Sequence, residues 1–157
     1  MWAIIAEAML GFGDKAVELY RMINPIEHSK TKELANQYKI EPYVISADIY
    51  GYGNLIGQGG WSWYTGSASW YYVCILKYIL GLNVKNGNLV IKPAIPKYWS
   101  GYSLKYKYGE SVYNITVKNP ESKNCGVEKF IYNGEEIQEK KIKLQNDGKI
   151  NEIEIIM

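Results

Sequence analysis

Cysteine and histidine are scarce in this chain, which argues against several kinds of site. The 157 residues include two cysteines and one histidine. Cys74 lies in an apolar run and Cys125 in a polar loop, so the sequence predicts neither a disulfide framework nor a metal site. Two free, reduced thiols fit a cytoplasmic protein instead.

Net charge and long apolar runs are scarce as well. Lys and Arg total 18 and Asp and Glu total 16, and the resulting net charge of +2 predicts no nucleic-acid and no membrane partner. The longest apolar run is far too short to span a bilayer, and Glu7 interrupts the apolar start, so no secretory signal is predicted. Core-like helical sequence begins at the first residue, from which we expect the chain to begin within something larger.

Helical periodicity is the main pattern up to residue 82. Apolar residues recur at helical spacing over 2–10 and 16–23, and the Gly-Phe-Gly between them predicts an antiparallel helical hairpin in which Asp14 caps the second helix. Thr31 is expected to cap a short helical turn. After a loop-like stretch, a third helix is predicted from about Thr65 to Leu80.

Alternation replaces helical periodicity after residue 84. Apolar and polar residues alternate over 103–108 and 113–118, and Gly109-Glu110-Ser111 joins these runs as a tight hairpin. Asn133-Gly134 and Asp147-Gly148 lie between apolar residues and are interpreted as two further hairpin turns. About six short strands of this kind predict an antiparallel sandwich. The predicted fold class is therefore α+β, with a helical part over 1–84 and a β domain over 85–157.

The unusual passage is the stretch 57–72, which combines aromatic with small residues and has almost no charge. Trp and Tyr offer a flat apolar ring for the C–H groups of a sugar and a polar tip for its hydroxyls, while glycine lets the backbone approach a ligand. Core filling is the alternative, and it is favoured for any one Trp taken alone. For the whole segment we predict a site for a neutral glycan. The aromatic residues are Trp61, Trp63, Tyr64, Trp70, Tyr71 and Tyr72.

Thr65-Gly66-Ser67 lies where the third helix is predicted to begin. The N–H groups and partial positive charge at a helix N-terminus hold an anion, and a Thr hydroxyl beside a Gly N–H would complete half of a phosphate cradle. Ordinary capping by Thr65 is the alternative, and it is favoured for these residues alone. No Lys or Arg lies between Lys39 and Lys77, so a cation for phosphate has to come from elsewhere.

Three segments carry a resemblance to a known family. Glu41-Pro42-Tyr43-Val44, Ala47-Asp48-Ile49-Tyr50 and the run 59–68 resemble the signature of the inverting disaccharide phosphorylases, glycoside hydrolase family 94. Asn24-Pro25-Ile26-Glu27-His28 and the run 93–99 extend the similarity, which covers residues 1 to about 119. The family includes cellobiose phosphorylase, chitobiose phosphorylase and the phosphorylase-like domain of cyclic β-1,2-glucan synthase.

The resemblance implies the last helices of an (α/α)6 barrel followed by an antiparallel β-sandwich-like C-terminal domain. It also implies that inorganic phosphate attacks a β-glucosidic bond with inversion while one Asp protonates the leaving oxygen. No cofactor or metal is then expected, because phosphate is the co-substrate. Thr65 and Gly66 correspond to residues that hold the phosphate. The sugar-binding residues implied are Glu41, Tyr43, Gln58, Trp61, Trp63 and Tyr64.

Departures from the family pattern indicate an incomplete site. The family's general acid Asp and its phosphate-binding Arg and His belong upstream of residue 1, so no residue here is given a catalytic role. Ala47 is close to the position of a phosphate-binding amide in some members, and Gln58 replaces an Arg that many members have. His28 is expected to be a hydrogen-bonded loop side chain. Asp48 is interpreted as a structural carboxylate or one that supports the site.

The sequence therefore predicts the C-terminal fragment of an inverting glycoside phosphorylase or glucan synthase, inactive by itself. Its expected partners are phosphate and a β-linked gluco-oligosaccharide or disaccharide. One alternative is a non-catalytic carbohydrate-binding or interaction module. Another is one half of a split enzyme, because helices cut from a barrel expose an apolar face, which a missing N-terminal barrel segment or a second copy of the chain would cover.

Overall fold

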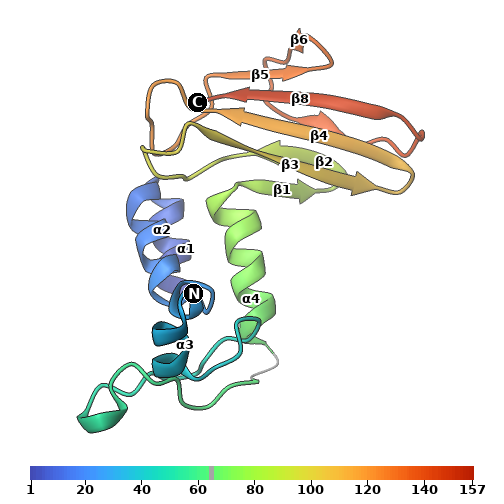
Figure 1. Ribbon diagram of the computed structural model, residues 1–157. Coiled ribbons are helices and arrows are strands. Elements are labelled where there is room, and N and C mark those ends of the chain that lie inside the picture. Colours follow the sequence, from blue (N-terminus) through green and yellow to red (C-terminus); the bar gives the residue numbers. More distant parts are fainter. Residues whose placement is uncertain (64–65) are drawn as a thin grey trace.

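The computed structural model describes residues 1–63 and 66–157. Three helices lie between a β layer at one end and a layer of loops at the other (Figure 1). They are α1 (Trp2–Met9), α2 (Gly13–Met22) and α4 (Ser67–Val73). The loop layer contains α3 (Lys32–Tyr38) and two 3-10 turns, η1 (Glu27–Ser29) and η2 (Gly53–Leu55). The fold is mixed α+β, as the sequence predicts.

The α1–α2 pair forms the predicted helical hairpin. Gly11 follows α1 with φ +83°, the left-handed conformation with which many helices end. Ile4 and Ala8 of α1 are buried in the same core cluster as Ala16 and Val17 of α2. Each helix therefore buries one face against the other.

The capping predictions for α2 and α3 have opposite outcomes. Thr31 caps α3 as predicted, and its Oγ1 accepts the Leu34 N–H at 3.3 Å. Asp14 does not cap α2, so that prediction is wrong: the N-cap position belongs to Phe12, and Asp14 lies in the first turn. Its Oδ1 accepts the Lys97 N–H at 2.9 Å instead. The carboxylate thus ties the start of α2 to the segment that leads into the five-stranded sheet.

The third predicted helix is α4. It begins at Ser67, and the predicted start at Thr65 lies outside the described residues. From Cys74 to Ile79 the helix continues as a π-helical segment, η3. The spacing of apolar residues does not distinguish this wider turn from an α-helix, because one turn of π-helix shifts the pattern by only one residue.

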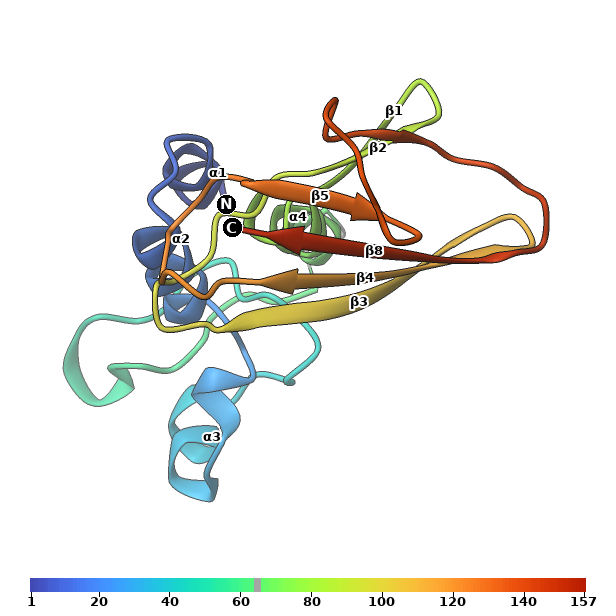
Figure 2. The ribbon, with the colours of Figure 1, turned by 90° about the horizontal axis from the view of Figure 1, so that it is seen from above.

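The described residues contain eight strands in two sheets. In Figure 2, β3, β4, β8 and β5 lie side by side in this order. The smaller sheet has the order β1-β2-β7 and the larger one the order β3-β4-β8-β5-β6. The strands are β1 (Leu82–Lys85), β2 (Asn88–Ile91), β3 (Gly101–Tyr108), β4 (Ser111–Lys118), β5 (Lys129–Tyr132), β6 (Glu135–Glu136), β7 (Ile142–Lys143) and β8 (Ile150–Ile156).

Two of the predicted hairpins are confirmed. β3 and β4 pair antiparallel across Gly109-Glu110, and β5 and β6 pair across Asn133-Gly134. Asn133 and Gly134 have φ of +49° and +89°, the conformation that a two-residue hairpin of this kind requires. In β4 the alternate residues Tyr113, Ile115 and Val117 are buried, as the alternation predicts.

The third hairpin and the purely antiparallel sheet are wrong predictions. β8 runs parallel to β4, and β7 pairs with β2 in the other sheet, so Asp147-Gly148 lies on a connection between two sheets. Ser111 holds this connection, because its Oγ accepts the Asp147 and Gly148 N–H groups at 2.9 and 3.0 Å. The alternation of apolar and polar residues predicts which side chains are buried, but it does not determine which strand pairs with which.

One core joins the two sheets to the helices. It combines Phe130 and Ile155 of the larger sheet with Leu89 of the smaller one and with Ala16 and Cys74 of the helical part, all of them fully buried. The helices α1, α2 and α4 therefore pack on the β layer with one end, and the loop residues 57–63, the first part of the aromatic-glycine stretch, lie near the other end of these helices (Figure 1).

Candidate functional site

The loop layer is built around an irregular pair of chain segments. Ile49 and Gly59 form an isolated antiparallel bridge. Around it, the Tyr50 N–H donates to the Gln58 carbonyl at 2.9 Å, and the Ala47 N–H donates to the Trp61 carbonyl at 2.7 Å. These backbone bonds bring the segments 47–50 and 57–61 side by side, and they thereby join two parts of the predicted signature, 47–50 and the start of the run 59–68.

Asp48 is a structural carboxylate in this pair, as one of the two predicted roles has it. Its Oδ1 accepts the Trp61 N–H at 3.0 Å. A Cβ added to Gly60 would lie 2.4 Å from Asp48 Oδ2, and one added to Gly59 would lie 2.2 Å from Ile40 Cγ1. The two glycines therefore make room for neighbouring side chains of the loop layer, a structural reason that differs from the backbone approach to a ligand suggested by the sequence.

Three of the predicted sugar-binding residues come together. Trp63 Nε1 donates to Glu41 Oε1 at 3.3 Å, and the Tyr43 ring meets the Trp63 ring edge-on with centroids 6.1 Å apart. Tyr43 is 70% exposed and Trp63 65% exposed. A core role is therefore wrong for Trp63, and a Trp whose polar edge is bonded while much of its ring meets solvent is typical of a binding surface.

The other aromatics of the stretch divide into exposed and buried members. Trp61 is 72% exposed and Tyr72 62% exposed, whereas Tyr71 is buried. The Tyr71 ring stacks on Tyr20 at 4.6 Å and its hydroxyl donates to the Tyr20 carbonyl, so Tyr71 fills the core. Burial raises the pKa of Tyr71, and its phenol stays protonated. Tyr64 lies outside the described residues.

Gln58 contacts the ammonium group of Lys39, a pair that the sequence did not predict. Lys39 Nζ donates to Gln58 Oε1 at 3.2 Å. Lys39 follows α3 with φ +57°, and this left-handed turn sends the chain back toward the signature segments. The signal available in the sequence was the Thr31 cap, because a helix of two turns from Thr31 ends beside residue 39.

The start of α4 is open to solvent where the structure describes it. Gly66 is exposed, and a Cβ added there would meet nothing within 4 Å. Its carbonyl accepts the Trp70 N–H at 3.0 Å, which begins the helical bonding. Thr65, the other predicted phosphate-binding residue, lies outside the described residues.

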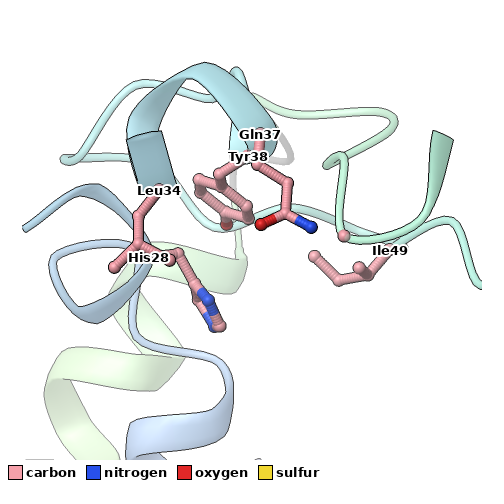
Figure 3. A pocket seen from close by; sticks show the side chains of 6 residues that line it. His28, Leu34, Gln37, Tyr38 and Ile49 are labelled. Carbon is pink, nitrogen blue, oxygen red and sulfur yellow. The ribbon is translucent and has the colours of Figure 1, made fainter. Parts of the chain in front are cut away.

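A small cavity lies in the same layer between α3, η1 and the paired segments at Ile49 and Gly57, but it is not the predicted site (Figure 3). Its volume is about 100 Å³, well below the 300–1,000 Å³ of common ligand pockets. His28 stacks on Tyr38 with centroids 5.0 Å apart, and its Nε2 lies 2.8 Å from the Met22 carbonyl, so it is the hydrogen-bonded loop side chain that was predicted. The cavity is lined by His28, Leu34, Gln37, Tyr38, Ile49 and Gly57.

The arrangement supports binding more clearly than chemistry. In residues 1–63 and 66–157, no three His, Cys, Asp or Glu side chains are grouped so as to hold a metal ion. Within the same residues, no helix is long and apolar enough to cross a membrane. Exposed rings, one carboxylate bonded to a ring N–H and one Lys bonded to an amide give an apolar surface with a few polar groups.

Comparison with known proteins gives related sequences. The chain is 31% identical over 158 residues to the N,N'-diacetylchitobiose phosphorylase of Vibrio furnissii, and the aligned region covers 99% of this chain and 19% of that protein. It is 28% identical over 161 residues to the solabiose phosphorylase of Paenibacillus borealis, covering 98% of this chain and 20% of that protein. It is 40% identical over 116 residues to the cyclic beta-(1,2)-glucan synthase NdvB of Rhizobium meliloti (strain 1021), covering 74% of this chain and 4% of that protein.

The chain thus spans about a fifth or less of the length of these relatives. The sequence model of the glycosyl hydrolase 94 superfamily, catalytic domain, matches residues 1–81, which contain every helix described above and the whole loop layer. This match covers more than half of the chain and agrees with the resemblance carried by the signature segments. The chain therefore belongs to the glycosyl hydrolase 94 superfamily.

Proposed function

We propose that this chain supplies part of the sugar- and phosphate-binding surface of a glycoside phosphorylase or glucan synthase. In the complete protein this surface would serve the attack of inorganic phosphate on a β-glucosidic bond, with the general acid supplied by polypeptide outside residues 1–157. The contact between Glu41 and Trp63 carries this proposal, since it fixes an exposed aromatic ring beside a carboxylate.

The sugar is expected to lie against the cluster of Glu41, Tyr43 and Trp63. Glu41 Oε1 accepts the Trp63 ring N–H at 3.3 Å, which orients the indole while leaving 65% of the residue exposed. An exposed indole face attracts the C–H face of a pyranose, and a carboxylate beside it accepts hydrogen bonds from sugar hydroxyls. Trp61, on the adjoining segment, is a further exposed ring for a neighbouring sugar unit.

The phosphate is expected at the start of α4. Backbone N–H groups of a first helical turn have no partner within the helix and favour an anion, and Gly66 leaves the approach to them open. By sequence position the hydroxyl of Thr65 adjoins the same place. Lys39 brings a positive charge to the loop layer in spite of the cation-free stretch that follows it. Two of the relatives are named phosphorylases, which supports phosphate as the co-substrate.

Titration calorimetry with cellobiose, laminaribiose and sophorose, with and without inorganic phosphate, tests this function. We expect binding that phosphate strengthens, and a loss of affinity of about tenfold in Trp63→Ala because the exposed ring that contacts the sugar is removed. Tyr52→Ala is the matched control, since Tyr52 is a 91% exposed aromatic of the same layer outside the cluster. Circular dichroism checks that both variants are folded.

Each other outcome has a distinct meaning. Binding that Trp63→Ala weakens but phosphate does not change would favour a non-catalytic carbohydrate-binding module. Absence of binding in the wild-type chain would contradict a sugar surface on these residues. We also expect no release of glucose 1-phosphate from any of the three disaccharides by residues 1–157 alone, and measurable turnover would overturn the external general acid.

A further inference from the structure

An open cleft lies between α2, η1 and the segment that leads into β3, and we call it the α2 cleft. Its volume is about 450 Å³, which falls within the 300–1,000 Å³ of common ligand pockets, whereas the cavity beside His28 holds about 100 Å³. It shares no residue with the cluster of Glu41, Tyr43 and Trp63. The residues that line it are Asp14, Glu18, Arg21, Met22, Glu27 and Tyr98.

Two carboxylates of the α2 cleft are each held through one oxygen. Asp14 Oδ1 accepts the Lys97 N–H at 2.9 Å, and Glu18 Oε1 accepts a hydrogen bond from Lys15 Nζ at 2.9 Å. Among the hydrogen bonds of the described residues, none engages Asp14 Oδ2 or Glu18 Oε2. An ionised carboxylate is an acceptor only, so these two oxygens suit hydroxyl donors of a ligand.

The third carboxylate belongs to a group of charges where α2 ends. Glu27 Oε2 accepts hydrogen bonds from Lys30 Nζ at 2.5 Å and from Arg21 Nη2 at 3.4 Å, and these bonds leave Glu27 Oε1 for another donor. Hydrogen bonding to Lys30 lowers the pKa of Glu27, so this side chain is charged at neutral pH. The Arg21 guanidinium has five N–H donors. A hydroxyl group at this place can therefore donate to the carboxylate and accept from the guanidinium.

The charges around the α2 cleft balance, because its three carboxylates are matched by the cations of Lys15, Arg21 and Lys30. A balanced set favours neither an anion nor a cation, whereas hydroxyl groups bond to side chains of both signs. Tyr98 is 68% exposed and offers a flat ring for the C–H face of a pyranose. Met22, which is 55% exposed, adds further apolar surface.

We propose that the α2 cleft binds a pyranose unit of a neutral oligosaccharide. The sugar hydroxyls donate to the three carboxylates and accept from Arg21, and one face of the sugar ring packs on Tyr98. This site goes beyond the proposed function, because it requires neither phosphate nor the cluster of Glu41, Tyr43 and Trp63. It gives the chain a second point of attachment to a glycan.

An amide NMR titration of residues 1–157 tests the α2 cleft, because it locates binding at individual residues. The titrants are cellobiose, laminaribiose and sophorose, and the protein is the Trp63→Ala variant, so that stacking on Trp63 does not contribute. With at least one disaccharide we expect saturable shift changes at the amides of 14–27 and 97–98. Tyr98→Ala in the same background is expected to weaken this binding about tenfold, because the ring that contacts the sugar is removed.

Tyr52→Ala in the same background is the matched control, since Tyr52 is 91% exposed and does not line the α2 cleft. It is expected to leave the binding unchanged. Tyr98→Ala should not change the urea midpoint of unfolding, because Tyr98 is largely exposed, and this result separates lost binding from lost folding. Glucosamine and glucuronic acid, a cationic and an anionic relative of glucose, are expected to bind no more tightly than glucose.

Three outcomes would overturn the inference. They are an absence of shift changes at these amides with all three disaccharides, binding that Tyr98→Ala does not weaken, and tighter binding of glucosamine or glucuronic acid than of glucose. The proposed function fails separately. Its failure would leave the amides of Glu41, Tyr43 and Trp63 unchanged in the wild-type chain while the amides of the α2 cleft still respond.

Discussion

The β part and the helical part of this chain bury their apolar residues to very different degrees. In the β part the alternate residues of β4 and β8 close a core in which Phe130, Tyr113 and Ile155 are fully buried. Among the described residues, all exposed large apolar side chains except Val84, Tyr98 and Ile150 precede Leu82. Both parts have apolar residues at regular spacing. In the β part most of these residues are buried, whereas many of those in the helical part are exposed.

The difference follows from the way each kind of element is covered. A strand has two faces, and one layer of helices or a second sheet is enough to bury the apolar one. A helix that is apolar on several sides needs neighbours on several sides. α1 has α2 and η3 as neighbours, and Trp2, Met9 and Leu10 lie exposed outside the core that these elements share. The helical part therefore shares one core with the β part but leaves apolar surface exposed.

Core deletion is expected to show the largest contrast between the two parts. Phe130→Ala removes a fully buried ring and should lower the free energy of unfolding by about 3–5 kcal/mol. Met9→Ala, at a 75% exposed position of α1, should change it by less than about 0.5 kcal/mol. Urea denaturation followed by circular dichroism measures both. Similar losses in the two variants would remove the contrast.

The junction between the parts is expected to give a smaller effect. A Cβ added to Gly13, at the start of α2, would lie 2.1 Å from the Ile95 carbonyl oxygen, so Gly13→Ala should force the backbones apart at a cost of about 1–3 kcal/mol. Gly51→Ala is the control, because nothing lies within 4 Å of its added Cβ. Thermal unfolding distinguishes them, and a Gly13→Ala variant as stable as Gly51→Ala would mean that α2 and the Ile95 segment are not held together.

The smallest expected effect is a pH dependence within the β part. Hydrogen bonding to Lys149, and then to Ser111, holds the pKa of Asp147 below its ordinary value of 3.8. A lowered pKa in the folded state means that this carboxylate stabilises the fold above its unfolded pKa and loses that contribution as pH falls through the folded value. Wild-type protein should therefore lose slightly more stability than Asp147→Asn between about pH 5 and pH 2, as measured by urea titration at each pH. Parallel pH curves for the two proteins would argue against a role of Asp147 in holding the connection between the sheets.

The sequence predictions were correct where a few neighbouring residues decide the structure. Thr31 caps α3, and Asn133-Gly134 forms a hairpin, because the hydrogen bonds and the φ angles concerned belong to adjacent residues. Asp14 was assigned a local role, but it bonds to Lys97, which is 83 positions away. Asp147-Gly148 resembles the other hairpin turns, yet the strands on either side of it enter different sheets.

The candidate site shows the same limit. Residue types and spacing predict a binding surface for the aromatic-glycine stretch as a whole, but they favoured a core role for any single Trp. Trp63 meets Glu41 across 22 positions, and Lys39 meets Gln58 across 19 positions. Such contacts depend on how the loop folds back, which neither residue encodes alone.

By itself the sequence determined the types of most elements, the buried face of β4 and the family. These follow from side-chain spacing and short motifs, which reflect the surroundings of each residue in turn. Only the tertiary structure decided which strands are neighbours, which aromatic rings reach solvent and which helix face is left uncovered. The reason is that each of these features depends on how segments far apart in the sequence pack around a common core. A local pattern of apolar residues is compatible with several such packing partners.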